Sequence, residues 1–357
     1  MISLQGYNIQ FQDQGFIQLK EQLRTGAYSK IFVLVDTNTE QYCLPILQKA
    51  LMDYELNIIS IEAGEAHKNI QTCQIIWTAL MNQQADRKSV LLNLGGGVIG
   101  DMGGFCASTF KRGMDFIQIP TTLLAQVDAS IGGKLGIDFA LVKNSIGLFK
   151  NPKAVYLLSD FFDTLPQNEL YSGFAEIVKH ALIEDGRYFS QLLTSSNLAN
   201  LVWEPIIAHS LSIKKKIVEQ DPFEQNIRKS LNFGHTIGHA VESLSWETKL
   251  PLLHGEAVAI GMLTESYLSW KLTGLLETDL AQITTYLLRL YPSYDLTNLD
   301  PTAILALIRQ DKKNEHNQIC FTLLKEIGTF KINVHAEDEL ILEALNYYNQ
   351  LTQGIKI

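Results

Sequence analysis

Two short apolar runs place the strongest limit on the fold of this chain. Residues 31–36 read IFVLVD and residues 89–94 read SVLLNL, and neither run alternates apolar with polar side chains. A strand with one face in water alternates, whereas a parallel strand covered by helices on both faces is apolar throughout. We therefore expect a parallel sheet within an α/β domain, and we place this domain at residues 1–160.

Helical periodicity dominates the rest of the chain. Apolar positions repeat at helical spacing in six segments, which are 168–184, 205–219, 228–245, 254–274, 277–290 and 302–311. Turns are expected at Pro222, Pro251 and Pro292. The pattern predicts a second, mostly α-helical domain at residues 161–357.

Composition narrows the class of protein. The chain has 357 residues, of which 46% are hydrophobic and 19% are charged, and both values are typical of a globular protein. Its formal net charge of -9 argues against nucleic-acid binding, which needs Lys and Arg to neutralise phosphates. No apolar run approaches the roughly 18 residues that cross a bilayer, and the start lacks the pattern of a signal peptide. We therefore expect a cytoplasmic protein with no nucleic-acid or membrane partner.

A glycine-rich segment directly follows the second apolar run. Residues 95–105 read GGGVIGDMGGF, and so few side chains let backbone N–H groups and a helix N-terminus approach a phosphate. The segment also satisfies the GxGxxG pattern, but the acidic residue of that fingerprint should end the next strand, whereas Asp115 precedes it. The pattern favours a phosphate or pyrophosphate site over an ordinary dehydrogenase fingerprint.

Isolated polar groups then occur in a glycine-rich and otherwise apolar stretch, residues 120–144. They are Thr121, Thr122, Asp128, Lys134, Lys143 and Asn144. A solvated surface would carry more charge, so the stretch favours the lining of a pocket. A buried ion pair between Asp128 and a lysine is the alternative.

The helical half contains an unusual polar stripe. Arg228, Asn232, His235, His239 and Glu242 follow one another at spacings of four, three, four and three, which places them on one face of a single predicted helix. The stripe indicates either a solvated face or a polar cavity, and Gly234 and Gly238 favour the cavity because a solvent face does not need them.

Further metal-ligating side chains lie elsewhere in this half. Glu176 and Lys179 share one helical face, where a surface ion pair is the plain alternative. His254 opens a later helix and could add a third ligand to the two histidines of the stripe. Position 236 is Thr, so the HExxH pattern of zinc proteases is absent. One carboxylate and two imidazoles would leave a coordination position open, as in catalytic zinc sites.

Seven motifs together resemble the 3-dehydroquinate synthase family of sugar-phosphate cyclases. In chain order they are GGGVIGD, PTTLLAQVD, GGK, KN, SGFAEIVK, LNFGHTIGHA and HGEAVAIGM. The resemblance runs from about Asp36 to Lys313, and it implies an N-terminal dinucleotide-binding domain followed by a helical metal- and substrate-binding domain. The chain departs from the family pattern at residues 139–142, where FALV replaces an expected turn before Lys143 and Asn144.

The resemblance also implies the cofactors and the residues that hold them. NAD would be bound by Asp36, Asn38, Glu65, Lys68, Gly96, Gly97, Asp101, Thr121, Thr122, Lys143, Thr164 and Leu165. A catalytic Zn²⁺, with Co²⁺ as the alternative, would be held by Glu176, His235 and His254. The resemblance makes His239 a proton-transfer group rather than a ligand.

The remaining site residues follow from the same resemblance. The residues with an expected catalytic role are Asp128, Lys134, Asn144, Lys179, Glu224 and His239. Those expected to bind the anionic sugar phosphate are Arg112, Lys214, Arg228, Asn232 and either Lys312 or Lys313. Arg112 resembles an arginine that the family supplies across a dimer interface, so a homodimer is expected.

The implied activity is a lyase reaction of the shikimate pathway, which supplies aromatic amino acid biosynthesis. The substrate, 3-deoxy-D-arabino-heptulosonate 7-phosphate, would undergo transient oxidation by NAD, phosphate elimination, re-reduction and intramolecular aldol closure to 3-dehydroquinate. Three alternatives stay open: a cyclase for another sugar phosphate, a metal-dependent polyol dehydrogenase, and an inactive metal- or nucleotide-binding protein. The cations Arg228 and Lys312 or Lys313 favour a substrate with a carboxylate.

Overall fold

The chain folds into two compact units. The computed structural model describes all residues except 5, 12–14, 130, 141, 195–197, 199–200, 311–318 and 354–357. Unit 1 comprises residues 1–166 and 202–215, and unit 2 comprises residues 167–201 and 216–357. The helix α8 (Trp203–Gln220) therefore contributes residues to both units. The domain limits of 1–160 and 161–357 stay a prediction.

Unit 1 is built on a seven-stranded sheet. The strands lie in the order β1 (Ile2–Leu4), β2 (Tyr7–Phe11), β9 (Ala154–Leu157), β6 (Asp115–Pro120), β5 (Val90–Gly95), β3 (Ile31–Asp36) and β4 (Leu56–Ile61). Only the β1–β2 pair is antiparallel, and the other neighbouring strands are parallel. The two apolar runs are the central strands β3 and β5, which confirms the predicted parallel sheet.

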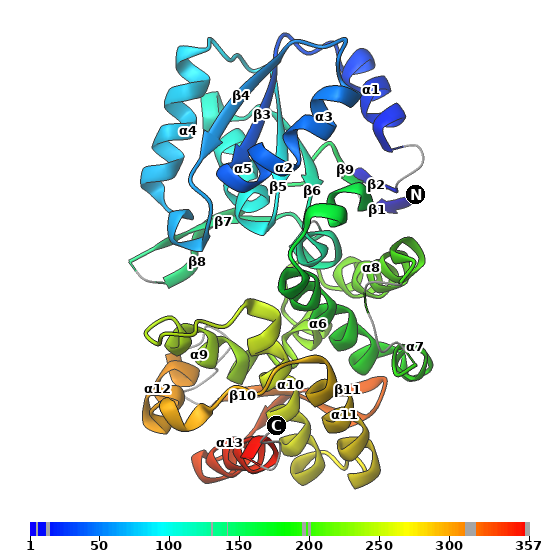
Figure 1. The fold of residues 1–357 in the computed structure, drawn as a ribbon, viewed down its shortest axis with the longest axis vertical. Coiled ribbons are helices and arrows are strands. Elements are labelled where there is room, and N and C mark those ends of the chain that lie inside the picture. The colour runs from blue at the N-terminus through cyan, green and yellow to red at the C-terminus, as the bar shows by residue number, and fades with distance from the viewer. Residues whose placement is uncertain are drawn as a thin grey trace. The chain divides into compact units, whose positions relative to one another are not determined.

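Both faces of this sheet are covered by helices, as Figure 1 shows. Phe32 and Leu34 of β3 point into one core, where α4 (Ile70–Asn82) and α5 (Gly97–Thr109) pack. Val33 and Val35 point into the opposite core, with α1 (Gly15–Gly26) and α3 (Leu44–Ala50), and α2 (Thr37–Tyr42) directly follows β3. Burial on both faces explains why β3 shows no polar alternation.

In the described part of unit 1, a two-stranded hairpin and four short helical turns complete the fold. The hairpin consists of β7 (Lys134–Phe139) and β8 (Val142–Phe149), and β8 is exposed along nearly its whole length. The short turns are η2 (Glu65–His67), η3 (Phe110–Arg112), η4 (Ala125–Ala129) and η5 (Ser159–Thr164). Leu135 and Ile137 of β7 join the core under α4 and α5.

Unit 2 is mostly helical. Its helices are α6 (Gln167–Glu184), α7 (Gly186–Leu192), α9 (His235–Ser245), α10 (His254–Leu272), α11 (Glu277–Leu290), α12 (Pro301–Gln310) and α13 (Asp338–Gln353), with short turns η7 (Ile227–Asn232) and η8 (Leu296–Asn298). One hairpin, β10 (Cys320–Glu326) with β11 (Thr329–His335), packs against α10. The α/β unit and the mostly helical unit confirm the predicted fold class.

Helix α10 is the centre of unit 2. Its residues are buried almost without interruption from Gly255 to Ser269, and it contacts α6, α9, α11 and α13 (Figure 1). A helix buried on all sides has no amphipathic stripe, because every face meets protein. Within the described part of the chain, no helix has the length and apolar character needed to span a membrane.

The single helix predicted over residues 228–245 is wrong. The structure has η7 to Asn232 and α9 from His235, and the two are separated by Gly234 in a left-handed conformation with φ +78°. Only His235, His239 and Glu242 therefore share one α-helical face, whereas Arg228 and Asn232 lie in the preceding turn.

Candidate active site

Some of the expected nucleotide residues of unit 1 lie where three parallel strands end. β3 ends at Asp36, β5 at Gly95 and β6 at Pro120, and these strands are neighbours in the sheet. Thr121 donates its backbone N–H to the Gly95 carbonyl at 3.1 Å, which ties the β6 end to the β5 end. Ligands of open α/β sheets bind outside the carboxyl ends of the strands, so the site has the expected position.

Helix α5 presents a bare N-terminus at this edge. Gly96 is its N-cap and offers no side-chain hydrogen bond to the first turn. A Cβ on Gly96 would lie 3.3 Å from Thr122 Cγ2, so Thr122 stands beside the backbone at this point. The free N–H groups of a helix N-terminus favour a phosphate.

Lys68, Asp101 and Asn144 meet in one hydrogen-bonded network. Lys68 Nζ donates to Asp101 Oδ2 at 2.7 Å and to Asn144 Oδ1 at 2.8 Å. Burial alone would lower the pKa of Lys68, but the Asp101 and Glu65 carboxylates raise it above its ordinary value. The network connects the end of η2, helix α5 and the exposed strand β8. The Asn144 backbone, with a φ of +50°, is held separately, because its N–H donates to Asp138 Oδ1 at 2.7 Å.

Asp128 and Lys214 form an ion pair within unit 1. Lys214 Nζ donates both to the backbone carbonyl and to the carboxylate of Asp128, and Lys214 is 4% exposed. The structure therefore contains the ion pair between Asp128 and a lysine that the sequence offered as the alternative. It does not exclude a role in substrate binding, because the Asp128 side chain is 35% exposed.

The other expected residues of unit 1 lie on loops, turns and the hairpin. Asn38 is in the first turn of α2, Glu65 in η2, Lys134 at the start of β7, Lys143 in β8, Thr164 at the end of η5, and Leu165 directly after it. Arg112 follows the far end of α5, about 20 Å of helix from its N-terminus. Within unit 1, Arg112 is therefore not brought to the nucleotide edge.

In unit 2, three helices bring a carboxylate and two imidazoles together. Glu176 of α6 is fully buried, and its Oε1 lies 3.4 Å from His235 Nε2 of α9 and 3.8 Å from His254 Nε2 of α10. Among the described residues, none donates a hydrogen bond to Glu176 Oε1. A buried carboxylate oxygen normally accepts a hydrogen bond, whereas this one faces two imidazole nitrogens instead. One carboxylate oxygen and two imidazole nitrogens are ligands typical of a zinc site.

Both histidines are oriented through their second ring nitrogen. His235 Nδ1 lies 3.1 Å from the Phe233 carbonyl, and His254 Nδ1 lies 3.1 Å from Glu242 Oε2. The partner atoms accept hydrogen bonds, so each Nδ1 donates. The Nε2 atoms are thereby directed to the Glu176 side, as is usual for histidine ligands of metals.

The ion pair of Glu176 with Lys179 is buried, not superficial. The exposed fractions of the two side chains are 0% and 1%, and Lys179 Nζ donates to Glu176 Oε2. Burial alone would raise the pKa of Glu176, but Lys179 and His254 lower it well below its ordinary range. The alternative of a surface ion pair is wrong.

His254 stands between two carboxylates. Burial alone would lower its pKa, but contacts with Glu176 and Glu242 outweigh burial and raise the pKa to about 10. Its proton must leave before Nε2 can ligate a metal.

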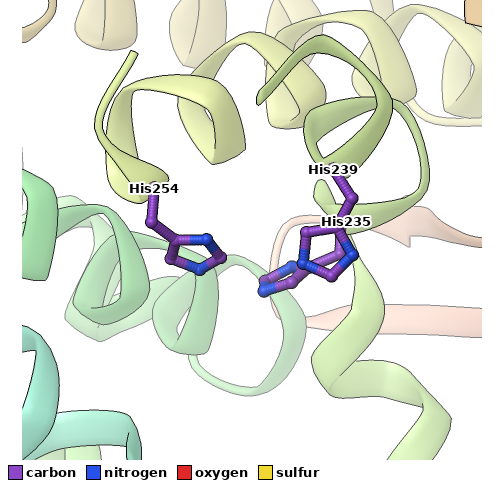
Figure 2. A group of neighbouring side chains, drawn as sticks. All are labelled: His235, His239 and His254. Atoms are coloured by element: carbon purple, nitrogen blue, oxygen red, sulfur yellow. The ribbon is translucent and has the colours of Figure 1, made fainter. Parts of the chain in front are cut away.

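His239 lies beside the two histidines, as Figure 2 shows. Its ring centroid is 5.0 Å from that of His235 and 5.8 Å from that of His254. One nitrogen of each of the three rings lies within 4.8 Å of the others, so a three-histidine ligand set is also geometrically open. The division into two ligands and one proton-transfer group stays a prediction.

Glycines let the three helices approach closely enough to form this cluster. A Cβ on Gly261 of α10 would lie 1.8 Å from the Gly234 carbonyl oxygen, and one on Gly238 of α9 would lie 2.9 Å from the Ala257 carbonyl oxygen. A Cβ on Gly255 would lie 2.0 Å from the carbonyl oxygen of Ser172 in α6. Backbone contact at these points fixes the distances between His235, His254 and the α6 carboxylate.

A compact loop and the turn η7 that follows it hold Glu224, Arg228 and Asn232 of unit 2. Asp221 accepts backbone N–H bonds from Gln225, Asn226 and Arg228. Asn232 Nδ2 donates to Glu224 Oε1 at 3.1 Å, and Arg228 donates to the Pro222 carbonyl at 2.7 Å. The structure therefore brings Glu224 and Asn232 together, whereas Lys312 and Lys313 lie outside the described residues.

Sequence reasoning missed two carboxylates of this site. Glu242 was placed on the polar stripe without a role, and the structure makes it the partner of His254 Nδ1. Glu265 of α10 is fully buried and accepts the backbone N–H groups of Gly234 and Ile237. A lone Glu in an otherwise uncharged stretch of a buried helix, residues 257–270, is a signal that could have drawn attention to it.

Sequence comparison places these features in a known family. The profile described as 3-dehydroquinate synthase N-terminal matches residues 58–172, and the profile described as 3-dehydroquinate synthase C-terminal matches residues 173–314. A 3-dehydroquinate synthase of Parabacteroides distasonis is 45% identical over 337 residues, which cover 93% of this chain and 95% of the relative. One of Helicobacter pylori is 40% identical, with coverage of 90% and 92%.

Solved structures share the whole fold. A 2-epi-5-epi-valiolone synthase from Streptomyces hygroscopicus, solved with NAD⁺ and Zn²⁺, gives a TM-score of 0.86 at 24% identity over 98% of both chains. A 2-deoxy-scyllo-inosose synthase, solved with carbaglucose-6-phosphate, NAD⁺ and Co²⁺, gives 0.83 at 21% over 96% of both. The fold is that of the sugar-phosphate cyclases. By its profile matches and its relatives, the chain belongs to the 3-dehydroquinate synthase family.

Proposed function

We propose that this chain converts 3-deoxy-D-arabino-heptulosonate 7-phosphate to 3-dehydroquinate and phosphate, as a lyase of the shikimate pathway. The observation that carries the proposal is the buried Glu176 oxygen that faces Nε2 of His235 and His254. Relatives named 3-dehydroquinate synthase match nearly the whole chain, which supports the choice of reaction.

Glu176, His235 and His254 would hold the catalytic metal, Zn²⁺ or Co²⁺. The donor set fits, because two imidazole nitrogens and one carboxylate suit either ion and leave a position open for substrate. When bound, the metal polarises a substrate hydroxyl and NAD accepts the hydride from its carbon. Glu242 and the Phe233 carbonyl hold the two imidazoles in the tautomer that leaves Nε2 available.

The nucleotide would bind at the carboxyl edge of the unit 1 sheet. Asp36 and Asn38 suit the adenosine ribose, and Gly96, Gly97 and the α5 N-terminus suit the pyrophosphate. The other residues assigned to NAD are Glu65, Lys68, Asp101, Thr121, Thr122, Lys143, Thr164 and Leu165. Lys68 and Asp101 would act mainly by ordering the loop, because each already bonds the other.

Each unit carries cations and amides that we assign to the substrate's anionic groups. In unit 2 these are Lys179, Arg228 and Asn232, and in unit 1 they are Lys134, Asn144 and Lys214. His239 would move a proton near the metal ligands, and its ring centroid 5.0 Å from that of His235 supports this role. Glu224 and Asp128 would orient these donors through Asn232 and Lys214.

Two further properties are part of the proposal. Arg112, which lies away from the nucleotide edge of its own unit 1, would complete the site of a second copy, so the enzyme would be a homodimer. We also propose that the chain acts in the cytoplasm.

The test is turnover without net redox change. Metal-loaded protein with catalytic NAD is given 3-deoxy-D-arabino-heptulosonate 7-phosphate, while released phosphate and NADH absorbance are followed. We expect many equivalents of phosphate, 3-dehydroquinate as product and no accumulation of NADH. Net NADH from a polyol would point to a dehydrogenase, the activity named for a probable glycerol dehydrogenase structure that matches with a TM-score of 0.65. Phosphate release only from another sugar phosphate would point to another cyclase.

A further inference from the structure

Helix α9, which carries His235 and His239, cannot cap its own N-terminus. Its N-cap is Gly234, which has no side chain and adopts a φ of +78°. A Cβ at this position would lie 2.6 Å from Met262 Cγ and 3.0 Å from the Val258 carbonyl oxygen. Ser, Thr, Asp or Asn, the usual N-cap residues, would therefore collide with α10, and the N–H groups of the first turn need an acceptor from elsewhere.

Glu265 of α10 supplies that acceptor. Its Oε2 accepts the Gly234 N–H at 2.6 Å and its Oε1 accepts the Ile237 N–H at 3.1 Å. Ile237 is the third residue of α9, the one that an N-cap side chain normally serves. Glu265 is fully buried, and a negative group at a helix N-terminus is favoured by the helix dipole.

One of these two bonds acts on the peptide that orients His235. The Gly234 N–H and the Phe233 C=O belong to the same planar trans peptide, so they point in opposite directions. Glu265 binds the N–H side of this peptide, and His235 Nδ1 donates to its carbonyl side at 3.1 Å. Glu265 thus holds the plane whose carbonyl fixes the rotation and tautomer of the His235 ring.

We propose that Glu265 is a positioning residue for the metal site, which acts on His235 through the Phe233–Gly234 peptide. The proposal rests on the proposed function, because it assumes that His235 is a metal ligand. His254 is oriented by direct contact with a carboxylate, that of Glu242. For His235, the orienting carboxylate is Glu265, and it acts through the Phe233–Gly234 peptide. Without Glu265 the peptide can rotate, the ring loses its fixed acceptor, and Nε2 no longer faces Glu176.

Zinc affinity measured on the purified full chain, by competition with a chromophoric chelator, tests the proposal. In Glu265→Gln, the amide NH₂ must face one of the two N–H groups, so we expect zinc to bind about 10–100-fold more weakly. We also expect the visible absorption of the Co²⁺ form to change, which a lesion remote from the ligands would not cause.

The matched control is Thr264→Val, one residue away on α10. Thr264 is equally buried, and within the described part of the chain its hydroxyl bonds only carbonyls of its own helix, those of Ile260 and Gly261. Thr264→Val should leave zinc affinity within about threefold of the wild type. If Glu265→Gln does not fold, Glu265→Asp is measured in the same way, because its shorter carboxylate cannot reach both N–H groups.

Two results would overturn the proposal, and they are distinguishable. If the wild-type chain binds no zinc, the metal site of the proposed function fails, and this inference fails with it. If the wild type binds zinc, and folded Glu265→Gln or Glu265→Asp binds it equally well with an unchanged Co²⁺ spectrum, only the role of Glu265 fails.

Discussion

The two units hold their charged groups in different surroundings. In unit 2, Glu176 and Lys179 lie on a buried helix with exposed fractions of 0% and 1%, and glycine contacts fix the neighbouring helices. In unit 1, the expected nucleotide residues lie at strand ends, in short turns and on the exposed strand β8. The difference suits the ligands, because a metal requires ligand distances near 2 Å with little tolerance, whereas a dinucleotide is bound by many weak contacts along its length.

The largest expected effect concerns the two histidines of α9. We expect His235→Ala to lose zinc and activity together, because it removes a ligand. We expect His239→Ala to retain about one equivalent of zinc while kcat falls roughly 10²–10⁴-fold, the usual contribution of a general acid or base. Metal analysis and turnover of the same preparations check both. Equal zinc loss in the two variants would show instead that all three histidines are ligands.

The second prediction tests the burial of the ion pair in unit 2. Lys179→Met keeps the length of the side chain but leaves the Glu176 carboxylate without its ammonium partner, which should reduce the unfolding free energy of the metal-free chain by about 3–5 kcal/mol. Urea denaturation measures the loss. Lys68→Met in unit 1 should cost less, because its partner Asp101 is 21% exposed and can be hydrated.

A surface pair supplies the control for this measurement. Lys216 and Glu184 have side chains that are 57% and 20% exposed, so Lys216→Met should cost at most about 1 kcal/mol. A loss of similar size in Lys179→Met would mean that the Glu176 carboxylate is stabilised mainly by the histidines.

The parallel sheet and most helices could be predicted because their signals are local. β3 and β5 show an uninterrupted apolar run, and α6, α10 and α11 begin and end within a few residues of the predicted segments. The break at Gly234 could not be predicted in this way, because the polar stripe continues through it and the residue that stabilises it, Glu265, is 31 positions away. The hairpin β10–β11 and helix α13 follow no motif, and their packing on α10 is a long-range property.

Part of the candidate site was also accessible from sequence. The resemblance places Glu176, His235 and His254 in one site, and the structure brings their side chains together. The roles of Glu242 and Glu265 beside the histidines could not be predicted. The sequence does not show whether a carboxylate contacts an imidazole ring, the backbone or water. The sequence allowed an ion pair between Asp128 and a lysine, but it did not reveal that the lysine is Lys214, which was expected to bind substrate.

The third prediction concerns glycine contacts, which both units contain. Gly261→Ala in unit 2 would place a Cβ 1.8 Å from a backbone oxygen of α9, so the helices must separate, at about 1–3 kcal/mol or more. Thermal unfolding and zinc affinity should both decline. Gly100→Ala in unit 1 is the comparison, because its Cβ would meet only the flexible Gln118 side chain, at 3.3 Å, and we expect a small change. A similar loss of stability in both variants would contradict the view that glycine contacts fix the helices of unit 2 more closely than those of unit 1.

The smallest effect on stability is expected at Asp36 in unit 1. Asp36 Oδ1 accepts the backbone N–H groups of Asn38 and Thr39 at 3.0 and 2.8 Å, so it caps α2. Asn caps as well as Asp, so Asp36→Asn should change the unfolding free energy by less than about 0.5 kcal/mol. If the Asp36 carboxylate also accepts a hydrogen bond from a ribose hydroxyl, Asp36→Asn should bind NAD about tenfold more weakly than the wild type. This is the effect expected for the loss of a charge-assisted hydrogen bond.

Thr39→Val separates the two roles of Asp36. The Thr39 hydroxyl accepts the Asp36 N–H at 2.9 Å, so its loss weakens the cap without removing the carboxylate. We expect this variant to lose about 0.5–1 kcal/mol of stability and to bind NAD as the wild type does. Calorimetric titration with NAD measures the affinity of both variants. If Asp36→Asn binds NAD as the wild type does, Asp36 has a capping role alone. Unit 1 would then recognise the nucleotide through backbone groups at the α5 N-terminus.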